Sequence, residues 1–149
     1  MKSCLVFLLA LLMLCLKSCS GYDPDHPDTK GNKDAFELMT ELVPDSDIKG
    51  IYAFAEEFLG FDPLYCMAFT ATPEAVARIV EKRKMKKMDA PPQDESFPVP
   101  EPLKWWNAEE RKKSDYYVAE EMRDGTTYAM YYLWHDPKTG NCQFKLVYF

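Results

Sequence analysis

Histidine is scarce in this chain of 149 residues, which contains only His26 and His135. His26 falls in a polar stretch near the N-terminus, so His135 is the one imidazole that we expect in an ordered region. Histidine is the commonest metal ligand and general base, and its scarcity disfavours most metal-dependent and acid–base mechanisms. The five cysteines lack zinc-site spacing, and there is neither a glycine-rich phosphate loop nor a Gly-x-Ser-x-Gly elbow. The sequence therefore predicts no metal, no cofactor and no familiar enzyme.

Basic residues are also in short supply, with 18 Lys and Arg against 24 Asp and Glu. The net charge is −6, which disfavours nucleic acid as a partner because such proteins need an excess of cationic side chains. The chain is otherwise typical of a globular protein, with 47% apolar and 14% aromatic residues. Its length suits a single domain.

No apolar run is long enough for a membrane-spanning helix, which needs about 20 residues. The longest run, residues 4–16, has 13 residues and follows Lys2, as in the apolar region of a signal peptide. We therefore expect residues 1–19 to be removed as a signal peptide. Without Lys2 and Lys17 the net charge becomes −8.

The end of this leader, Leu16-Lys17-Ser18-Cys19, resembles the lipobox of bacterial lipoproteins, although lysine at position 17 is atypical. The resemblance implies that Cys19 becomes an acylated first residue and anchors the protein in the bacterial envelope. The alternative is ordinary cleavage near Ser18 or Ser20, which would release a periplasmic or secreted protein.

Cys66 and Cys142 remain after the leader and Cys19 are set aside. In an oxidising compartment they could form one disulfide across a separation of 76 residues. The alternative is two buried, reduced cysteines that act as small apolar side chains.

Residues 20–33 are polar and rich in Pro, Gly and Asp, so we expect a flexible tether. Residues 34–149 then form the domain. Apolar residues recur at helical spacing over 35–43, and Pro44 ends that helix. Residues 48–59 and 64–71 predict a β-hairpin, with a helix as the alternative for 48–59.

A second helix is predicted to begin at Thr72-Pro73-Glu74, where Thr72 is a suitable N-cap and Pro73 suits the first helical position. The helix ends in a basic cluster over residues 82–87, which favours a solvated terminus, with an acidic partner as the alternative. Residues 89–104 contain five prolines and predict a long extended loop.

Three strands are predicted over residues 116–122, 126–135 and 141–149, joined by turn sequences. The whole pattern indicates an α+β fold with a largely antiparallel sheet of about five strands and one or two helices on one face. Both faces of the strand 126–135 are apolar, so we expect either a central strand covered on both sides or an exposed aromatic platform. The candidate binding surface comprises Trp105, Trp106, Tyr131 and Trp134.

The aromatic segments Trp105-Trp106, 132–136 and 147–149 are together similar to those of small bacterial exported proteins. This resemblance implies a fold and no particular activity. The leading hypothesis is a non-enzymatic envelope lipoprotein that binds a protein or peptide. The alternatives are an inhibitor or immunity protein of a secreted enzyme, and an envelope hydrolase with Cys66 as nucleophile and His135 as base.

Overall fold

The computed structural model describes residues 21–58, 61–89, 103–123 and 125–149. The predicted signal peptide, Cys19 and most of the proline-rich loop lie outside these residues. Within the described part of the chain, no helix is long and apolar enough to cross a membrane.

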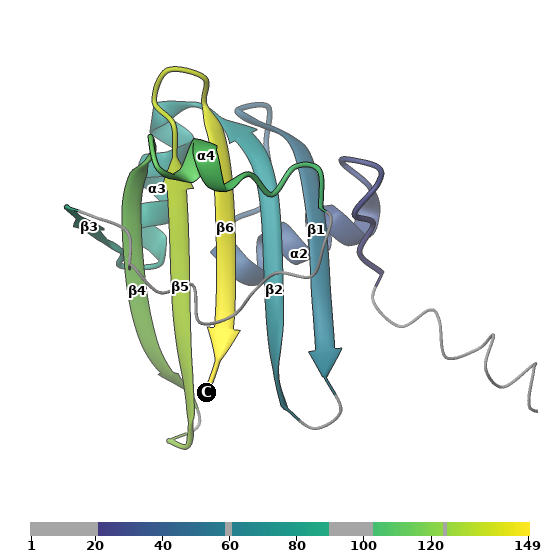
Figure 1. Cartoon of the computed structure of the whole chain (residues 1–149), viewed down its shortest axis with the longest axis vertical. Coiled ribbons are helices and arrows are strands. Elements are labelled where there is room, and N and C mark those ends of the chain that lie inside the picture. The colour runs from purple at the N-terminus through teal and green to yellow at the C-terminus, as the bar shows by residue number, and fades with distance from the viewer. Residues whose placement is uncertain (1–20, 59–60, 90–102, 124) are drawn as a thin grey trace, which may run out of the picture.

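The fold is built on one antiparallel sheet of six strands in the order β1-β2-β6-β5-β4-β3 (Figure 1). The strands are β1 (Ile48–Phe58), β2 (Phe61–Ala71), β3 (Lys86–Met88), β4 (Asp115–Arg123), β5 (Thr127–His135) and β6 (Asn141–Tyr148). The C-terminal strand β6 thus pairs with both the β1-β2 hairpin and the β4-β5 hairpin. This position makes β6 the centre of the domain, and its residues 142–147 are all buried.

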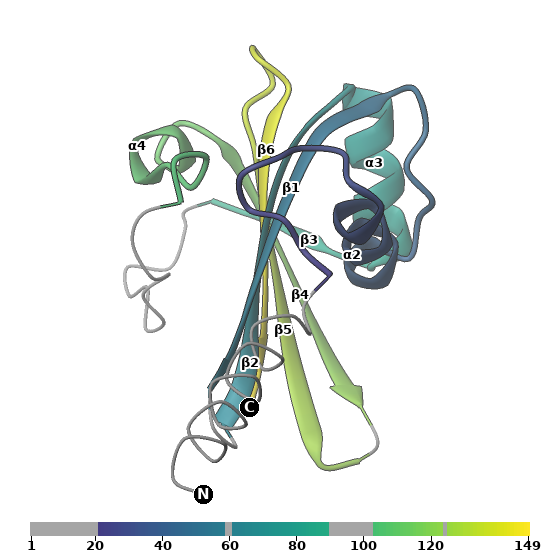
Figure 2. The same cartoon turned by 90° about the vertical axis from the view of Figure 1, so that its right-hand side faces the viewer.

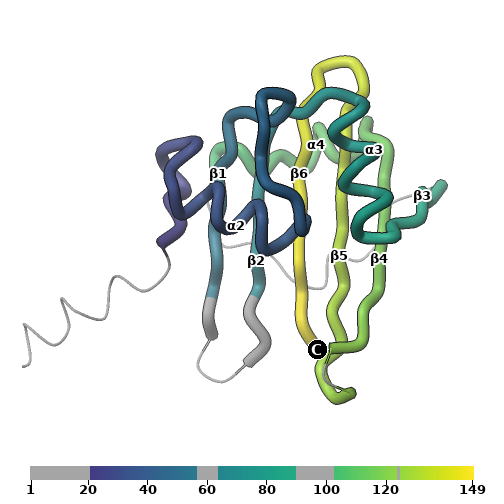
Figure 3. The backbone as a smooth tube through the Cα atoms, turned by 180° about the vertical axis from the view of Figure 1, so that it is seen from behind, coloured from purple at the N-terminus to yellow at the C-terminus, as the bar shows by residue number. Residues whose placement is uncertain are grey.

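Among the described residues, helices lie on both faces of the sheet (Figure 2). Helices α2 (Lys30–Thr40) and α3 (Pro73–Lys82) lie together on one face, which we call the α2-α3 face and which is turned toward the viewer in Figure 3. The short helix α4 (Ala108–Arg111) lies over the opposite face, the α4 face. Because strand residues alternate between faces, β2, β5 and β6 each contribute to two separate apolar clusters.

Helices α2 and α3 begin at capping residues. The side chains of Thr29 and Thr72 accept hydrogen bonds from the backbone N–H groups of Asn32 and Ala75, which satisfies one free donor at each helix start. Pro73 occupies the first turn of α3, as predicted. The buried side chains of α3, Ala75, Val76 and Ile79, form one face of that helix.

The predicted fold class is confirmed: the domain is α+β, with an antiparallel sheet and two helices packed on one face. The sheet has six strands instead of about five. The additional strand is β3, an exposed segment of three residues that begins in the predicted basic cluster. This strand could not be predicted from an apolar pattern in the sequence, because neither of its faces is buried.

Residues 21–33 differ from the expected flexible tether. Lys30 is already in the first turn of α2, and the preceding residues are fastened to the domain through Asn32. The buried Asn32 amide accepts from the backbone N–H of Asp23 at 2.7 Å and donates to the carbonyl of Ile51 at 2.9 Å. These bonds join residues far apart in the chain, so composition alone gave no sign of them.

Candidate functional site

The tryptophans of the candidate binding surface do come together, on the α4 face. Trp106 packs edge-on against both Trp105 and Trp134, with ring centroids 6.2 and 5.9 Å apart. Trp105 and Trp106 also pack on the cluster of Leu64, Cys66 and Val147. The rings of the adjacent tryptophans are nearly perpendicular to one another. Trp105 stacks with Tyr52, whereas Trp106 packs against Trp134.

Tyr131 does not belong to that surface. It is 1% exposed and lies in the core on the α2-α3 face, between its cross-strand neighbours Ala119 and Leu146. Trp134 is three positions further along the same strand, and an odd separation places two strand residues on opposite faces.

The chain that covers the α4 face is fastened to β6 by Gln143. The buried Gln143 amide accepts hydrogen bonds from the backbone N–H of Asn107 at 3.2 Å and from the Arg111 guanidinium at 2.9 Å. It also donates to the carbonyl of Asn107 at 3.1 Å. The Arg111 guanidinium stacks over the Trp106 ring at 4.7 Å, a favourable cation–π distance. Residues 103–111 therefore form a fixed part of the domain.

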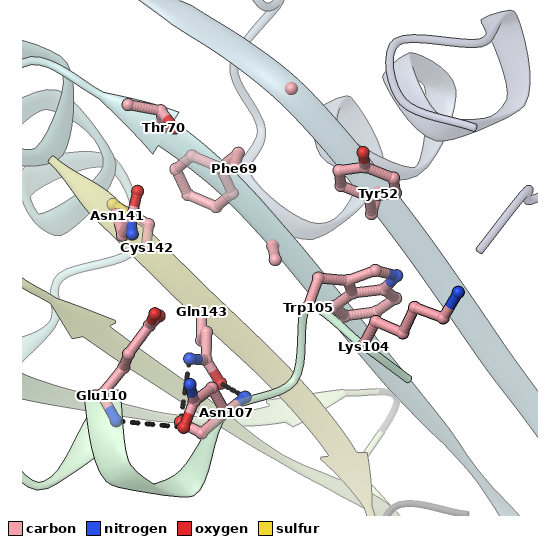
Figure 4. Close-up of a pocket in the computed structure, with 12 residues that line it drawn as sticks. Tyr52, Phe69, Thr70, Lys104, Trp105, Asn107, Glu110, Asn141, Cys142 and Gln143 are labelled. Atoms are coloured by element: carbon pink, nitrogen blue, oxygen red, sulfur yellow. Dashed lines mark hydrogen bonds between the residues drawn. The ribbon is translucent and has the colours of Figure 1, made fainter. Parts of the chain in front are cut away.

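Beside this cover lies a cavity of about 200 Å³, which we call the Trp105 hollow (Figure 4). Trp105 and Tyr52 form its aromatic wall, with ring centroids 6.0 Å apart and planes 23° apart. The rest of the hollow is lined by β1, β2, β6, α4 and the chain before α4. The lining residues are Gly50, Ala68, Phe69, Thr70, Lys104, Asn107, Glu110, Asn141, Cys142 and Gln143.

Several polar groups in the Trp105 hollow remain available. The Thr70 hydroxyl, the Asn141 side-chain amide and the Glu110 carboxylate make no hydrogen bond to any other residue in the described ranges. Lys104 adds an exposed ammonium group at the rim. An aromatic wall with available donors, acceptors and one charge of each sign is suited to a polar ligand that also has a stacking surface.

A second cavity, of about 400 Å³, adjoins the ends of α2 and α3 and is lined by both acidic and basic side chains. Its buried cation, Arg83, already bonds to the Glu41 carboxylate at 2.7 Å and lies 3.5 Å from the Glu121 carboxylate. The Tyr131 hydroxyl donates to Glu121 at 2.7 Å and accepts from Arg123 at 2.8 Å. Burial and the bond to Glu121 raise the pKa of Tyr131 to about 12. Because these side chains are engaged with the fold, the Trp105 hollow is the stronger candidate site.

The structure does not bring Cys66 and His135 together. Cys66 lies on the α4 face and is opposite Lys145, whereas His135 is opposite Cys142 on the α2-α3 face, with β6 between the two strands. His135 is 4% exposed, and burial lowers the pKa of its imidazole. A nucleophile and its base must be within hydrogen-bond reach, so these residues do not form a catalytic pair in this fold.

Cys66 and Cys142 are both present as thiols. They belong to neighbouring strands, but the register offsets them by three positions and places them on opposite faces of the sheet. A disulfide requires its two Cβ atoms to approach within about 4.5 Å with suitable directions. Both cysteine side chains are buried in this structure, and burial raises the pKa of Cys142.

We expect both thiols to be protected from alkylation in the folded protein and to react only after unfolding, without a reducing agent. Both thiols are at most 2% exposed, so an alkylating reagent can reach them only when the domain unfolds locally or globally. Mass spectrometry of a chain that begins at Gly21 would count two alkyl groups after denaturation in iodoacetamide. Alkylation that appears only after reduction would instead establish the disulfide and contradict the separation seen here.

Metal ligands are not clustered: the described residues contain no group of three or more His, Cys, Asp or Glu side chains that could hold a metal ion. Comparison with protein-family models, curated proteins and solved structures finds no match. The function must therefore be argued from the site itself.

Proposed function

We propose that the protein is a non-enzymatic binding module, anchored in the bacterial envelope through acylated Cys19, which receives a peptide segment of an envelope protein. The observation that carries the proposal is the Trp105 hollow, where an aromatic wall adjoins polar groups that have no partner within the described residues. A peptide carries both backbone donors and acceptors and side chains that stack on aromatic rings. It therefore matches such a lining better than a purely apolar ligand does.

The position of the Trp105 hollow also supports a peptide as the ligand. Gly50 and Tyr52 come from β1, which is an edge strand of the sheet, and the pairing of β1 with β2 shifts register between Lys49 and Tyr52. The N–H groups of Gly50 and Ile51 on this edge already bond to the Asp28 carboxylate, so a peptide that enters from this edge would be held by the side chains of the hollow. Rigid aromatic side chains such as Trp105 lose little entropy on binding, which favours them as contact residues.

The experiment is selection of peptides from a random displayed library on the domain that begins at Gly21, followed by titration of one selected peptide by fluorescence anisotropy. We expect Lys104→Glu and Asn141→Ala each to weaken binding about tenfold, a loss of about 1.4 kcal/mol. Both side chains line the hollow, and neither is part of the buried core. The fold should therefore survive both substitutions.

Lys138→Glu is the matched control, because it makes the same charge change at an exposed position in the turn between β5 and β6. We expect this variant to bind the peptide as the unchanged protein does. The inhibitor hypothesis, which rests on the acidic surface, predicts instead that substitutions in the hollow leave binding to a secreted enzyme unaltered. Equal affinity of the Lys104→Glu and unchanged proteins for the selected peptide would remove the Trp105 hollow as the site.

A further inference from the structure

Residues 21–29, which we call the N-terminal arm, are held to the domain along their length. Asn32 is completely buried, and its side-chain amide donates to the carbonyls of Asp23, His26 and Ile51 at 2.8–2.9 Å. Because this single amide joins the arm to both α2 and β1, the arm cannot leave without exposing or orphaning several buried polar groups.

The first residues of the arm pack directly against the helix layer. The carbonyl of Gly21 lies so close to Gly31 that a Cβ atom at position 31 would overlap its oxygen. The next residue, Tyr22, packs against the core, and its ring contacts that of Tyr65 edge-on at 6.3 Å. The chain is therefore part of the folded domain from Gly21 onward.

The arm also reaches the Trp105 hollow around the edge of the sheet. Near its end, the Asp28 carboxylate accepts hydrogen bonds from the N–H groups of Gly50 and Ile51, both at 3.0 Å. On the other face of the sheet, the indole N–H of Trp105 donates to the carbonyl of Pro24 at 2.8 Å. One residue of the aromatic wall is thus bonded directly to the arm.

We propose that the acylated protein has no flexible tether, and that the docked arm holds the β1 edge and the Trp105 hollow next to the bilayer. This inference rests on the proposed acylation of Cys19. Only Ser20 separates that residue from Gly21 in the sequence. Two residues span at most about 7 Å, whereas a free segment of 14 residues could extend about 50 Å. The peptide partner must then be a membrane-proximal segment, because the hollow cannot reach far from the membrane surface.

The test uses the acylated protein, purified from the membrane fraction and reconstituted in phosphatidylcholine vesicles that carry a quencher on the lipid headgroup. A dye is placed on a cysteine introduced either at Lys49, in β1, or at Lys86, in β3. These strands are opposite edges of the sheet, five strand spacings or about 24 Å apart. The buried thiols of Cys66 and Cys142 leave the introduced cysteine as the reactive one.

We expect the dye at Lys49 to be quenched about threefold more than the dye at Lys86, because contact quenching falls steeply over the roughly 24 Å between the sheet edges. One further variant should abolish this difference. It has ten Gly and Ser residues inserted between Ser20 and Gly21, which adds a flexible segment of about 17 Å.

Equal quenching at the two edges of an acylated protein would overturn the inference and leave the lipid anchor intact. So would an insertion variant that behaves as the unchanged protein does. Intact mass measured on the same sample separates these results from failure of the anchor itself. A chain without acyl mass that begins after Cys19 would overturn both the anchor and the inference.

Discussion

Replacement of Arg83 by methionine is expected to lower the free energy of unfolding by about 3 kcal/mol. Arg83 directly follows α3, and its side chain is only 4% exposed. Its guanidinium donates to the carbonyls of Leu38 and Met39 at 2.8 and 2.7 Å. Those carbonyls belong to the last turn of α2, where helical acceptors lack a partner. Methionine keeps much of the apolar stem and removes every one of these donors.

The guanidinium of Arg83 also connects the helix layer to the sheet. It bonds to the Glu41 carboxylate at 2.7 Å and stacks over the ring of Tyr131 at 4.5 Å. The contacts of Arg83 with α2 and β5 form only when α2, α3 and β5 are all in place. We therefore expect the substitution to lower the free energy of the cooperative unfolding of the whole domain, which urea denaturation measures.

Lys82→Met is the matched control for Arg83→Met. Lys82 is the preceding residue and faces the same Glu41 carboxylate, but at 4.0 Å and with half of its side chain exposed. Such a pair contributes little, so we expect a change of no more than about 0.5 kcal/mol. If the two variants lose the same stability, the carbonyl contacts of Arg83 do not hold the helix layer as described.

Replacement of Trp106 by alanine is the second large effect that we expect, with a loss of about 3 kcal/mol of stability. Trp106 is half-buried, and its ring contacts Trp105, Trp134 and the Arg111 guanidinium. Its removal would leave a space over the apolar cluster of the α4 face. Urea denaturation gives the size of the loss, and near-ultraviolet circular dichroism reports whether the remaining aromatic rings stay ordered.

Met122→Ala provides the comparison for Trp106→Ala, because Met122 is also a large apolar residue next to the sheet but is 62% exposed. We expect it to change stability by no more than about 0.5 kcal/mol. A similarly small loss for Trp106→Ala would mean that residues 103–111 rest on the sheet without contributing to the core.

The strands could be predicted because their side chains alternate over a buried surface. In β5, Ala129, Tyr131 and Leu133 enter one cluster, whereas Tyr132 and Trp134 lie over the other face. The same alternation places Tyr131 and Trp134, which are three positions apart, on opposite faces of the sheet. Their separation could therefore have been predicted from the sequence. The two-sided covering of β5 is one of the alternatives that the sequence left open.

The site itself was less accessible to sequence analysis, because it depends on contacts between distant residues. Trp105 could be recognised as a candidate beside the proline-rich loop, whereas Lys104 was not predicted. Tyr52 and Asn141 meet Trp105 only when β1 and β6 lie in one sheet. Similarly, Arg83 is one of several basic residues over 82–87. Only the packing of α3 against α2 distinguishes this buried residue from its solvated neighbours.

The most direct test of the account is an NMR titration of the domain with the selected peptide. We predict that the largest chemical-shift changes fall on the indole N–H of Trp105 and on the backbone amides of Tyr52, Thr70 and Asn141, which surround the Trp105 hollow. Changes confined to the opposite edge of the sheet, around β3 and the neighbouring part of β4, would contradict the proposed site.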